Sequence, residues 1–306
     1  MLFRVIRNTV LATDIAEYLG LPMTGPDCSV ERACTPLRLT SNAVSYAPDG
    51  FVLPSEIPDD VLMLTATPMA STGLTHIVTR SPRADLARIV RHFFNTPAEA
   101  GVNPKAFVSA TARIGLGVHV AEGALIDHDV VVGNGSVVLA NAVLRGRVEI
   151  GERCLVKSNA SIGTESFGFF DGPSGRASRP EIGAVVIGHD VWVGANATIE
   201  RAGLVDTVIG DGVRIDDLSH IGSDVSIGSR VRVEAGAVIC RGVTLGDGCV
   251  IGPRVVVTQN RKVGRNSVVG AGSVVLADVP DSVVAAGSPA RVLRHVGPGD
   301  LDDPGF

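Results

Sequence analysis

One histidine lies among carboxylates and is the strongest candidate in this chain for acid–base chemistry. His220 follows Asp216 and Asp217 and precedes Asp224. Imidazole is the side chain that most often serves as a general base near neutral pH, and a neighbouring carboxylate can orient its ring. We therefore predict His220 as a general base, with Asp217 among the carboxylates that could orient it. The alternative is that His220 is an exposed or structural residue.

Other reactive side chains carry weaker signals. Ser223 follows His220 closely and is a candidate nucleophile, although no motif places a histidine for it. His128 and His189 each lack a partner at metal-ligand spacing, so we expect no metal. The five cysteines form no C-x-x-C pair or cluster with histidine, which is typical of a reduced, metal-free cytoplasmic protein.

A six-residue repeat positions these side chains. From residue 108 to residue 280 the chain reads in hexads such as IGERCL, VGANAT, IGDGVR and LGDGCV. A short period repeated this often predicts a solenoid, here a parallel β-helix with about 18 residues in each three-faced coil. The opening aliphatic residue should point inward, a glycine in second place should allow positive φ at a turn, and a small residue should fill the fifth place. His220 closes the hexad IDDLSH, a place that should point outward.

The repeat divides the chain into three parts. Residues 1–98 lack the period and predict a small α+β domain, with helices over 14–19 and 81–94 and strands over 43–47, 61–67 and 75–79. Residues 99–284 form the β-helix domain, and residues 285–306 a short tail. Loops at 164–186 and within 199–208 interrupt the repeat. The first contains Phe167, Phe169 and Phe170, which either pack on their own coil or form a lid over a ligand.

Composition excludes several classes of function. The chain has 306 residues and a net charge of −5. It has 36 glycines and only 4% aromatic residues, as a stacked aliphatic coil requires. Its basic residues are scattered, so we expect no nucleic-acid partner. It has no run of about 18 apolar residues and no apolar leader, so we predict no membrane span.

The long motifs resemble one enzyme family. ESFGFFDGPSGRASRPEIGAVVIG and VWVGANATIERAGLVDTVIGDGVRIDDLSHIGSDVSIG, preceded by a small α+β domain, resemble the UDP-3-O-acylglucosamine N-acyltransferases over about residues 12–230. The resemblance implies a left-handed coil and a homotrimer with active sites in the grooves between subunits. It also implies an acyl thioester donor, on the phosphopantetheine of acyl carrier protein or on coenzyme A, and no tightly bound cofactor. A sugar amine would attack the thioester carbonyl.

The resemblance also proposes site residues, with departures. Ser223 stands where the family has its catalytic histidine, and Asn260 stands where it has a second histidine. At one position of the family's nucleotide pocket this chain has Asp49 in place of an asparagine, which favours a base edge with two donors. The nucleotide would then differ from UDP, or the acceptor would not be a nucleotide sugar. The alternative is that Asp49 merely ends a turn. The full set is Tyr46, Asp49, Phe51, Phe167, Phe169 and Asn196 for the acceptor, and Asn260 and Arg254 for the donor groove.

These observations lead to one predicted activity and leave alternatives open. We predict acyl transfer from a thioester to an amino group, of a nucleotide-linked amino sugar or a natural-product intermediate. The amine could react without a side-chain base, because positioning alone contributes several kcal/mol. The alternatives are an O-acyltransferase acting on a hydroxyl and a catalytically inactive trimeric scaffold.

Overall fold

The computed structural model describes residues 9–48, 50–52, 54, 57–58, 60–69, 74–94, 99–173 and 175–301. The chain divides between Pro97 and Ala98 into two compact units. No helix among these residues is long and apolar enough to cross a membrane.

The first unit is a mixed sheet with helices, as its sequence predicts. Helix α1 (Ala12–Leu19) ends at Gly20 in the left-handed region, and α2 (Pro82–Ile89) continues into the π-helical turn η1 (Val90–Phe94). The sheet order is β2-β7-β6-β5-β4. The strands are β2 (Met23–Thr24), β4 (Arg32–Ala33), β5 (Ala43–Tyr46), β6 (Val61–Thr65) and β7 (Thr75–Val78), beside the separate pair β1 (Val10–Leu11) and β3 (Ser29–Val30).

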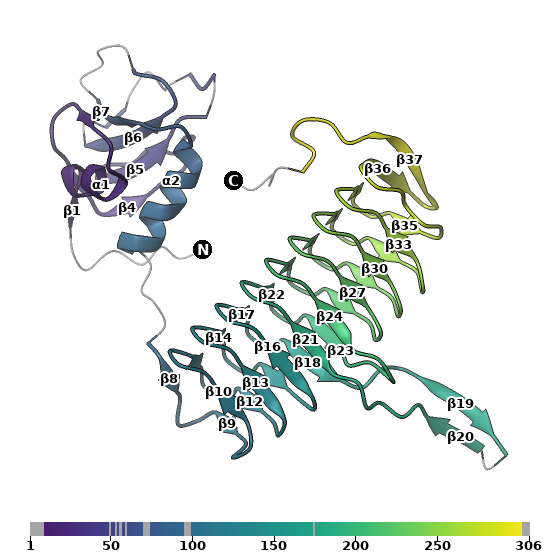
Figure 1. The fold of residues 1–306 in the computed structure, drawn as a ribbon. Coiled ribbons are helices and arrows are strands. Elements are labelled where there is room, and N and C mark those ends of the chain that lie inside the picture. Colours follow the sequence, from purple (N-terminus) through teal and green to yellow (C-terminus); the bar gives the residue numbers. More distant parts are fainter. Residues whose placement is uncertain are drawn as a thin grey trace. The chain divides into compact units, whose positions relative to one another are not determined.

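The second unit is a left-handed parallel β-helix (Figure 1), which confirms the parallel β-helix predicted from the hexads and the left-handed coil implied by the family resemblance. Its strands lie on three faces, named here by the strands that the structure describes on each. The eight-stranded face consists of β10 (Arg113–Ile114), β13 (Val130–Val132), β16 (Val148–Ile150), β21 (Val185–Ile187), β24 (Thr207–Ile209), β27 (Ser226–Ile227), β30 (Thr244–Leu245) and β33 (Lys262–Val263).

The other two faces complete each coil. The nine-stranded face consists of β9 (Phe107–Val108), β12 (Leu125–Ile126), β15 (Val143–Leu144), β18 (Ser161–Thr164), β23 (Thr198–Glu200), β26 (His220–Ile221), β29 (Val238–Ile239), β32 (Val256–Val257) and β35 (Val274–Val275). The eleven-stranded face consists of β8 (Gly101–Val102), β11 (His119–Val120), β14 (Val137–Val138), β17 (Leu155–Val156), β22 (Trp192–Val193), β25 (Arg214–Ile215), β28 (Arg232–Val233), β31 (Val250–Ile251), β34 (Val268–Val269), β36 (Val283–Gly287) and β37 (Ala290–His295).

The buried positions explain the hexad, but the role predicted for its second-place glycines needs correction. The opening aliphatics, such as Ile162 and Ile221, and the small fifth-place residues, such as Cys249, are fully buried. Apart from Gly163, where the first loop leaves the coil, the second-place glycines have no positive φ, contrary to the prediction. They are needed because the coils approach closely: a Cβ on Gly151 would lie 2.4 Å from the carbonyl oxygen of Gly188. Positive φ occurs instead at the fourth place, as at Arg153.

The two interruptions and the tail have defined structures. The first loop contains a hairpin, β19 (Phe169–Gly172) and β20 (Gly175–Ser178), which projects from the coil (Figure 1). Phe167 is 90% exposed and Phe169 51% exposed, so these aromatics do not pack on their own coil. In the tail predicted from residue 285, β37 pairs antiparallel with β36 and ends the eleven-stranded face.

Candidate functional site

A polar window interrupts an aliphatic column on the nine-stranded face. The outward residues on successive coils are Leu125, Val143, Ser161, Thr198, His220, Val238 and Val256, each aligned with the next by strand pairing. All are half-buried in the single chain. The three polar residues lie at the edge from which both interruptions leave the coil, so the window and the loops share one location.

His220 is the last polar residue of this window, next to Val238, and both of its ring nitrogens lie near a polar partner. Its Nδ1 is 2.7 Å from Oγ1 of Thr198, the aligned residue on the preceding coil. Its Nε2 is 3.8 Å from Oε1 of Glu200, and its side chain remains 37% exposed. The ring is therefore held by a hydrogen bond with Thr198 and faces Glu200, and more than a third of its side chain stays exposed.

Glu200 is held at the end of β23. The backbone N–H of Ser223 donates to its Oε2 at 2.9 Å, which leaves Oε1 facing the histidine ring. Burial raises the pKa of Glu200 above its ordinary value, and the charge of His220 opposes this rise. Both effects follow from a carboxylate that is 14% exposed beside an imidazole.

The first loop is anchored beside the window by ion pairs. Arg179, from the loop, pairs with Asp224 at 3.2 Å, and Arg241 on the next coil pairs with the same carboxylate at 2.7 Å. Asp224 also accepts the N–H of Gly203 at 3.1 Å. Although burial by itself would raise the pKa of Asp224, the hydrogen bonds from Arg241 and Gly203 and the positive charge of Arg179 lower it.

A second set of contacts fixes the base of the same loop. The backbone N–H of Ser166 donates to both carboxylate oxygens of Glu181, at 2.9 and 3.0 Å. Arg201 pairs with Glu165 at 2.8 Å and approaches Glu181 at 3.6 Å. The loop therefore leaves the coil at a fixed place and angle next to His220.

Two predicted catalytic residues are not placed for catalysis. Asp217 does not orient His220, because it accepts hydrogen bonds from Lys157 Nζ at 2.9 Å and from the N–H of Ala195 at 2.8 Å. The hydrogen bond from Lys157 is the largest cause that lowers the pKa of Asp217. Ser223 is fully buried and its hydroxyl has no hydrogen-bond partner among the described residues, so it cannot attack a substrate. Its backbone supports Glu200 instead.

The predicted ligand residues of the coil lie mostly at its corners. Asn196, Arg254 and Asn260 all occupy fourth places with φ between 55° and 57°. Asparagine tolerates this left-handed conformation better than most residues, so the backbone accounts for both asparagines. Asn196 and Arg254 lie at the edge between the eleven- and nine-stranded faces, and Asn260 at the edge between the nine- and eight-stranded faces, so the structure does not bring Asn260 and Arg254 together. Phe167 and Phe169 contact each other edge to face at 4.9 Å between ring centroids.

Of the three residues predicted to bind a nucleotide in the first unit, two lie within the described residues. Tyr46 is 8% exposed and belongs to that unit's hydrophobic core, so its ring is not an open stacking surface. Phe51 is half-buried and its N–H closes a turn on the carbonyl of Pro48. Asp49 lies outside the described residues.

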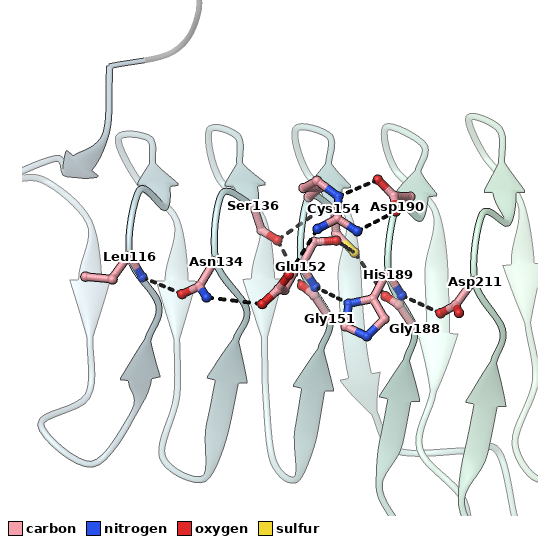
Figure 2. A network of polar contacts seen from close by, with 11 residues as sticks. Leu116, Asn134, Ser136, Gly151, Glu152, Cys154, Gly188, His189, Asp190 and Asp211 are labelled. Atoms are coloured by element: carbon pink, nitrogen blue, oxygen red, sulfur yellow. Dashed lines mark hydrogen bonds and ion pairs between the residues drawn. The ribbon is translucent and has the colours of Figure 1, made fainter.

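The lone histidine His189 has a structural role in a ladder of polar contacts at one edge of the coil (Figure 2). The N–H of Leu116 donates to Asn134 at 2.8 Å, the N–H of Glu152 to Nδ1 of His189 at 3.0 Å, and the N–H of His189 to Asp211 at 2.7 Å. Each side chain thus satisfies a corner amide of the preceding coil. Among the residues that the structure describes, no three His, Cys, Asp or Glu side chains are grouped to hold a metal ion.

Sequence reasoning missed Thr198 and Glu200 as partners of His220. Regular coils separate aligned residues by 18 positions, as for Leu116 and Asn134, but Thr198 and His220 are 22 positions apart. The second interruption supplies the additional residues. Counting the register across it would have aligned Thr198 with His220, whereas proximity in sequence pointed to Asp217.

Comparisons with known proteins agree with this fold. The family model described as bacterial transferase hexapeptide (six repeats) matches residues 129–164, 206–241 and 242–277, and that described as hexapeptide repeat of succinyl-transferase matches residues 184–216.

Curated relatives and solved structures extend the similarity beyond the repeats. A UDP-3-O-acylglucosamine N-acyltransferase of Coxiella burnetii is 27% identical over 243 residues, 72% of this chain and 71% of the relative. One of Azorhizobium caulinodans is 52% identical over 146 residues, 48% of this chain and 41% of the relative. The solved UDP-N-acetylglucosamine acyltransferase from Campylobacter jejuni is 25% identical, with a TM-score of 0.57 over 64% of this chain and 75% of that one.

Proposed function

We propose that this hexapeptide-repeat protein, which resembles the UDP-3-O-acylglucosamine N-acyltransferases, is itself a thioester-dependent N-acyltransferase. It moves an acyl group from acyl carrier protein or coenzyme A to an amino group of a nucleotide-linked amino sugar. The observation that carries the proposal is the position of His220 in the polar window of the nine-stranded face. There its ring contacts Thr198 and faces Glu200. The similarity to named N-acyltransferases supports the reaction type.

The site has what this reaction needs. The amine attacks the thioester carbonyl, and its proton must leave as the tetrahedral intermediate collapses. His220 supplies a base on an outer surface. The aliphatic column continues on one side of it as Val238 and Val256, which offers apolar surface for an acyl chain. The anchored loop with Phe167 lies on the acceptor side in this proposal.

The proposal includes a homotrimer with the site in a groove between copies. The exposed aromatics of the projecting hairpin and the half-exposed outward columns of the coil would be covered by a neighbouring copy. In that arrangement the groove, rather than a cavity within one chain, receives the donor and the acceptor.

A product assay tests the proposal. Purified protein is given acyl-CoA or acyl carrier protein with UDP-, GDP- or dTDP-linked amino sugars, and the product is identified by mass spectrometry after alkaline hydroxylamine, which cleaves esters and leaves amides intact. We expect an amide, and a loss of about 10²–10⁴-fold in rate for His220→Ala. His128→Ala is the control, because the His128 side chain is 63% exposed and its ring pairs with Asp129, away from the polar window.

Each other outcome has a definite meaning. A product that hydroxylamine cleaves would show that the acceptor group is a hydroxyl rather than an amine. No product, together with no thermal stabilisation by any nucleotide or acyl donor, would reject a transferase and favour a scaffold. Full activity in His220→Ala would remove His220 from the mechanism.

A further inference from the structure

The contacts of His220 determine which ring nitrogen is available as a base. A neutral imidazole carries one N–H and one lone pair. Nδ1 lies 2.7 Å from the Thr198 hydroxyl, and Nε2 lies 3.8 Å from Oε1 of Glu200. The two neighbours differ chemically, because a hydroxyl can donate or accept whereas an ionised carboxylate only accepts.

The carboxylate favours one tautomer by its charge. Glu200 is held in place by the N–H of Ser223 on its other oxygen. Once Glu200 is ionised, the favourable arrangement points the Nε2–H of His220 toward Oε1. The lone pair then lies on Nδ1, and the Thr198 hydroxyl donates its hydrogen to it. The basic lone pair of His220 is consequently covered by a hydroxyl and does not face a substrate directly.

We propose that the Thr198 hydroxyl is a catalytic residue that takes the proton from the reacting amine and passes its own proton to His220. This inference rests on the proposed N-acyltransferase function and adds a residue to its site. Thr198 lies outward on β23, half-buried, in the same polar window. Glu200 is a positioning residue that acts through His220.

The proton transfers balance in both halves of the reaction. The amine nitrogen forms a bond to the thioester carbon, Oγ1 of Thr198 accepts the N–H proton, and the hydroxyl proton moves to Nδ1 of His220. The resulting imidazolium is stabilised by Glu200. When the C–S bond breaks, the imidazolium returns a proton through Thr198 to the thiolate, which leaves as a thiol. The hydroxyl, the imidazole and the carboxylate end as they began.

Matched variants test the relay. Thr198→Val removes the hydroxyl and keeps the shape, while Thr198→Ser keeps the hydroxyl. We expect kcat of Thr198→Val to fall by about 10²-fold or more with KM changed by less than about threefold, and Thr198→Ser to stay within about tenfold of wild type. Thr244→Val is the control, because Thr244 occupies the same hexad place on the eight-stranded face.

The outcomes separate the relay from the proposed function. Full kcat in Thr198→Val, with His220→Ala inactive, would overturn the relay and leave His220 as a direct base. An acyl ester on Thr198, detected by mass spectrometry during turnover, would overturn it in favour of a nucleophile. Absence of amide product in the wild type would overturn the function itself.

A measurement on the wild-type protein covers the case in which Thr198→Val does not fold. The rate is followed across mixtures of H₂O and D₂O under conditions where acyl transfer limits turnover. Two protons moving together give a curved dependence on deuterium fraction, which supports the relay, and a linear dependence contradicts it.

Discussion

Asp224 forms ion pairs with two arginines, and we expect the longer of the two pairs to be the stronger one. The pair with Arg241 is shorter, 2.7 Å against 3.2 Å for Arg179. However, the Arg241 side chain is 58% exposed and that of Arg179 is 19% exposed, while Asp224 is 16% exposed. Burial therefore should decide the energies, because solvent screens exposed pairs.

The expected magnitudes follow from exposure. Exposed ion pairs typically contribute about 0.2–1 kcal/mol, so the coupling of Asp224 with Arg241 should lie below about 1 kcal/mol. Breaking a buried pair typically costs about 3–5 kcal/mol, and the residual exposure of Arg179 reduces this, so its coupling with Asp224 should be about 2 kcal/mol. The exposed pair Arg176–Asp171 in the same loop, with side chains 68% and 74% exposed, should couple least.

Double-mutant cycles with alanine provide the assay. The reporter is native-state hydrogen exchange of the N–H of Ile182, which donates to the carbonyl of Gly203 at 2.9 Å. This hydrogen bond joins two backbone groups, so none of the mutated side chains takes part in it. The protection of this amide gives the free energy of opening the loop. A coupling for Arg241 equal to or larger than that for Arg179 would refute the reasoning from burial.

Three further predictions concern other contacts. The folded pKa of Glu200 is raised above 4.5, so the contribution of Glu200 to the free energy of unfolding is greatest below that pH and declines as pH rises through the folded pKa. In urea unfolding, the stability of Glu200→Gln relative to wild type should therefore increase between about pH 4 and 7. A relative stability that decreases over this range would contradict the prediction. Burial raises the pKa of Cys249 to about 12, so native alkylation at pH 8 should label the half-buried Cys240 and spare Cys249, as peptide mapping would show. His189→Ala should lower the free energy of unfolding by about 1 kcal/mol through loss of its bond from Glu152, measured by denaturant titration, and no change would mean that water replaces it.

The coil was predictable because its hexad has a single physical cause. An aliphatic residue every six positions can be buried only if the chain turns through three faces, and the fully buried Ile162 and Ile221 occupy those places. The reason given for the second-place glycines was wrong, since the contact between coils, such as Gly151 against Gly188, is invisible in a single hexad. It appears only when two coils are stacked.

The site was predictable in part. The outward direction of His220 follows from its hexad place, but its partners depend on a register shifted by the second interruption. The burial of Ser223 depends on the corner geometry of the coil, and the burial of Tyr46 depends on the packing of the first unit. The projection of the hairpin with Phe167 arises from anchoring by distant residues that no local pattern connects.

The ladder in Figure 2 gives the stack a direction. At that edge the corner amide of one coil is satisfied by a side chain that belongs to the following coil, as His189 does for Glu152 and Asp211 for His189, and the series ends with Asp281, which accepts the N–H of Arg265 at 2.8 Å. During synthesis from the N-terminus, a coil that carries such a side chain therefore satisfies an amide of the coil already made. These contacts run in one direction along the stack, and Asp281 makes the last of them among the residues that the structure describes.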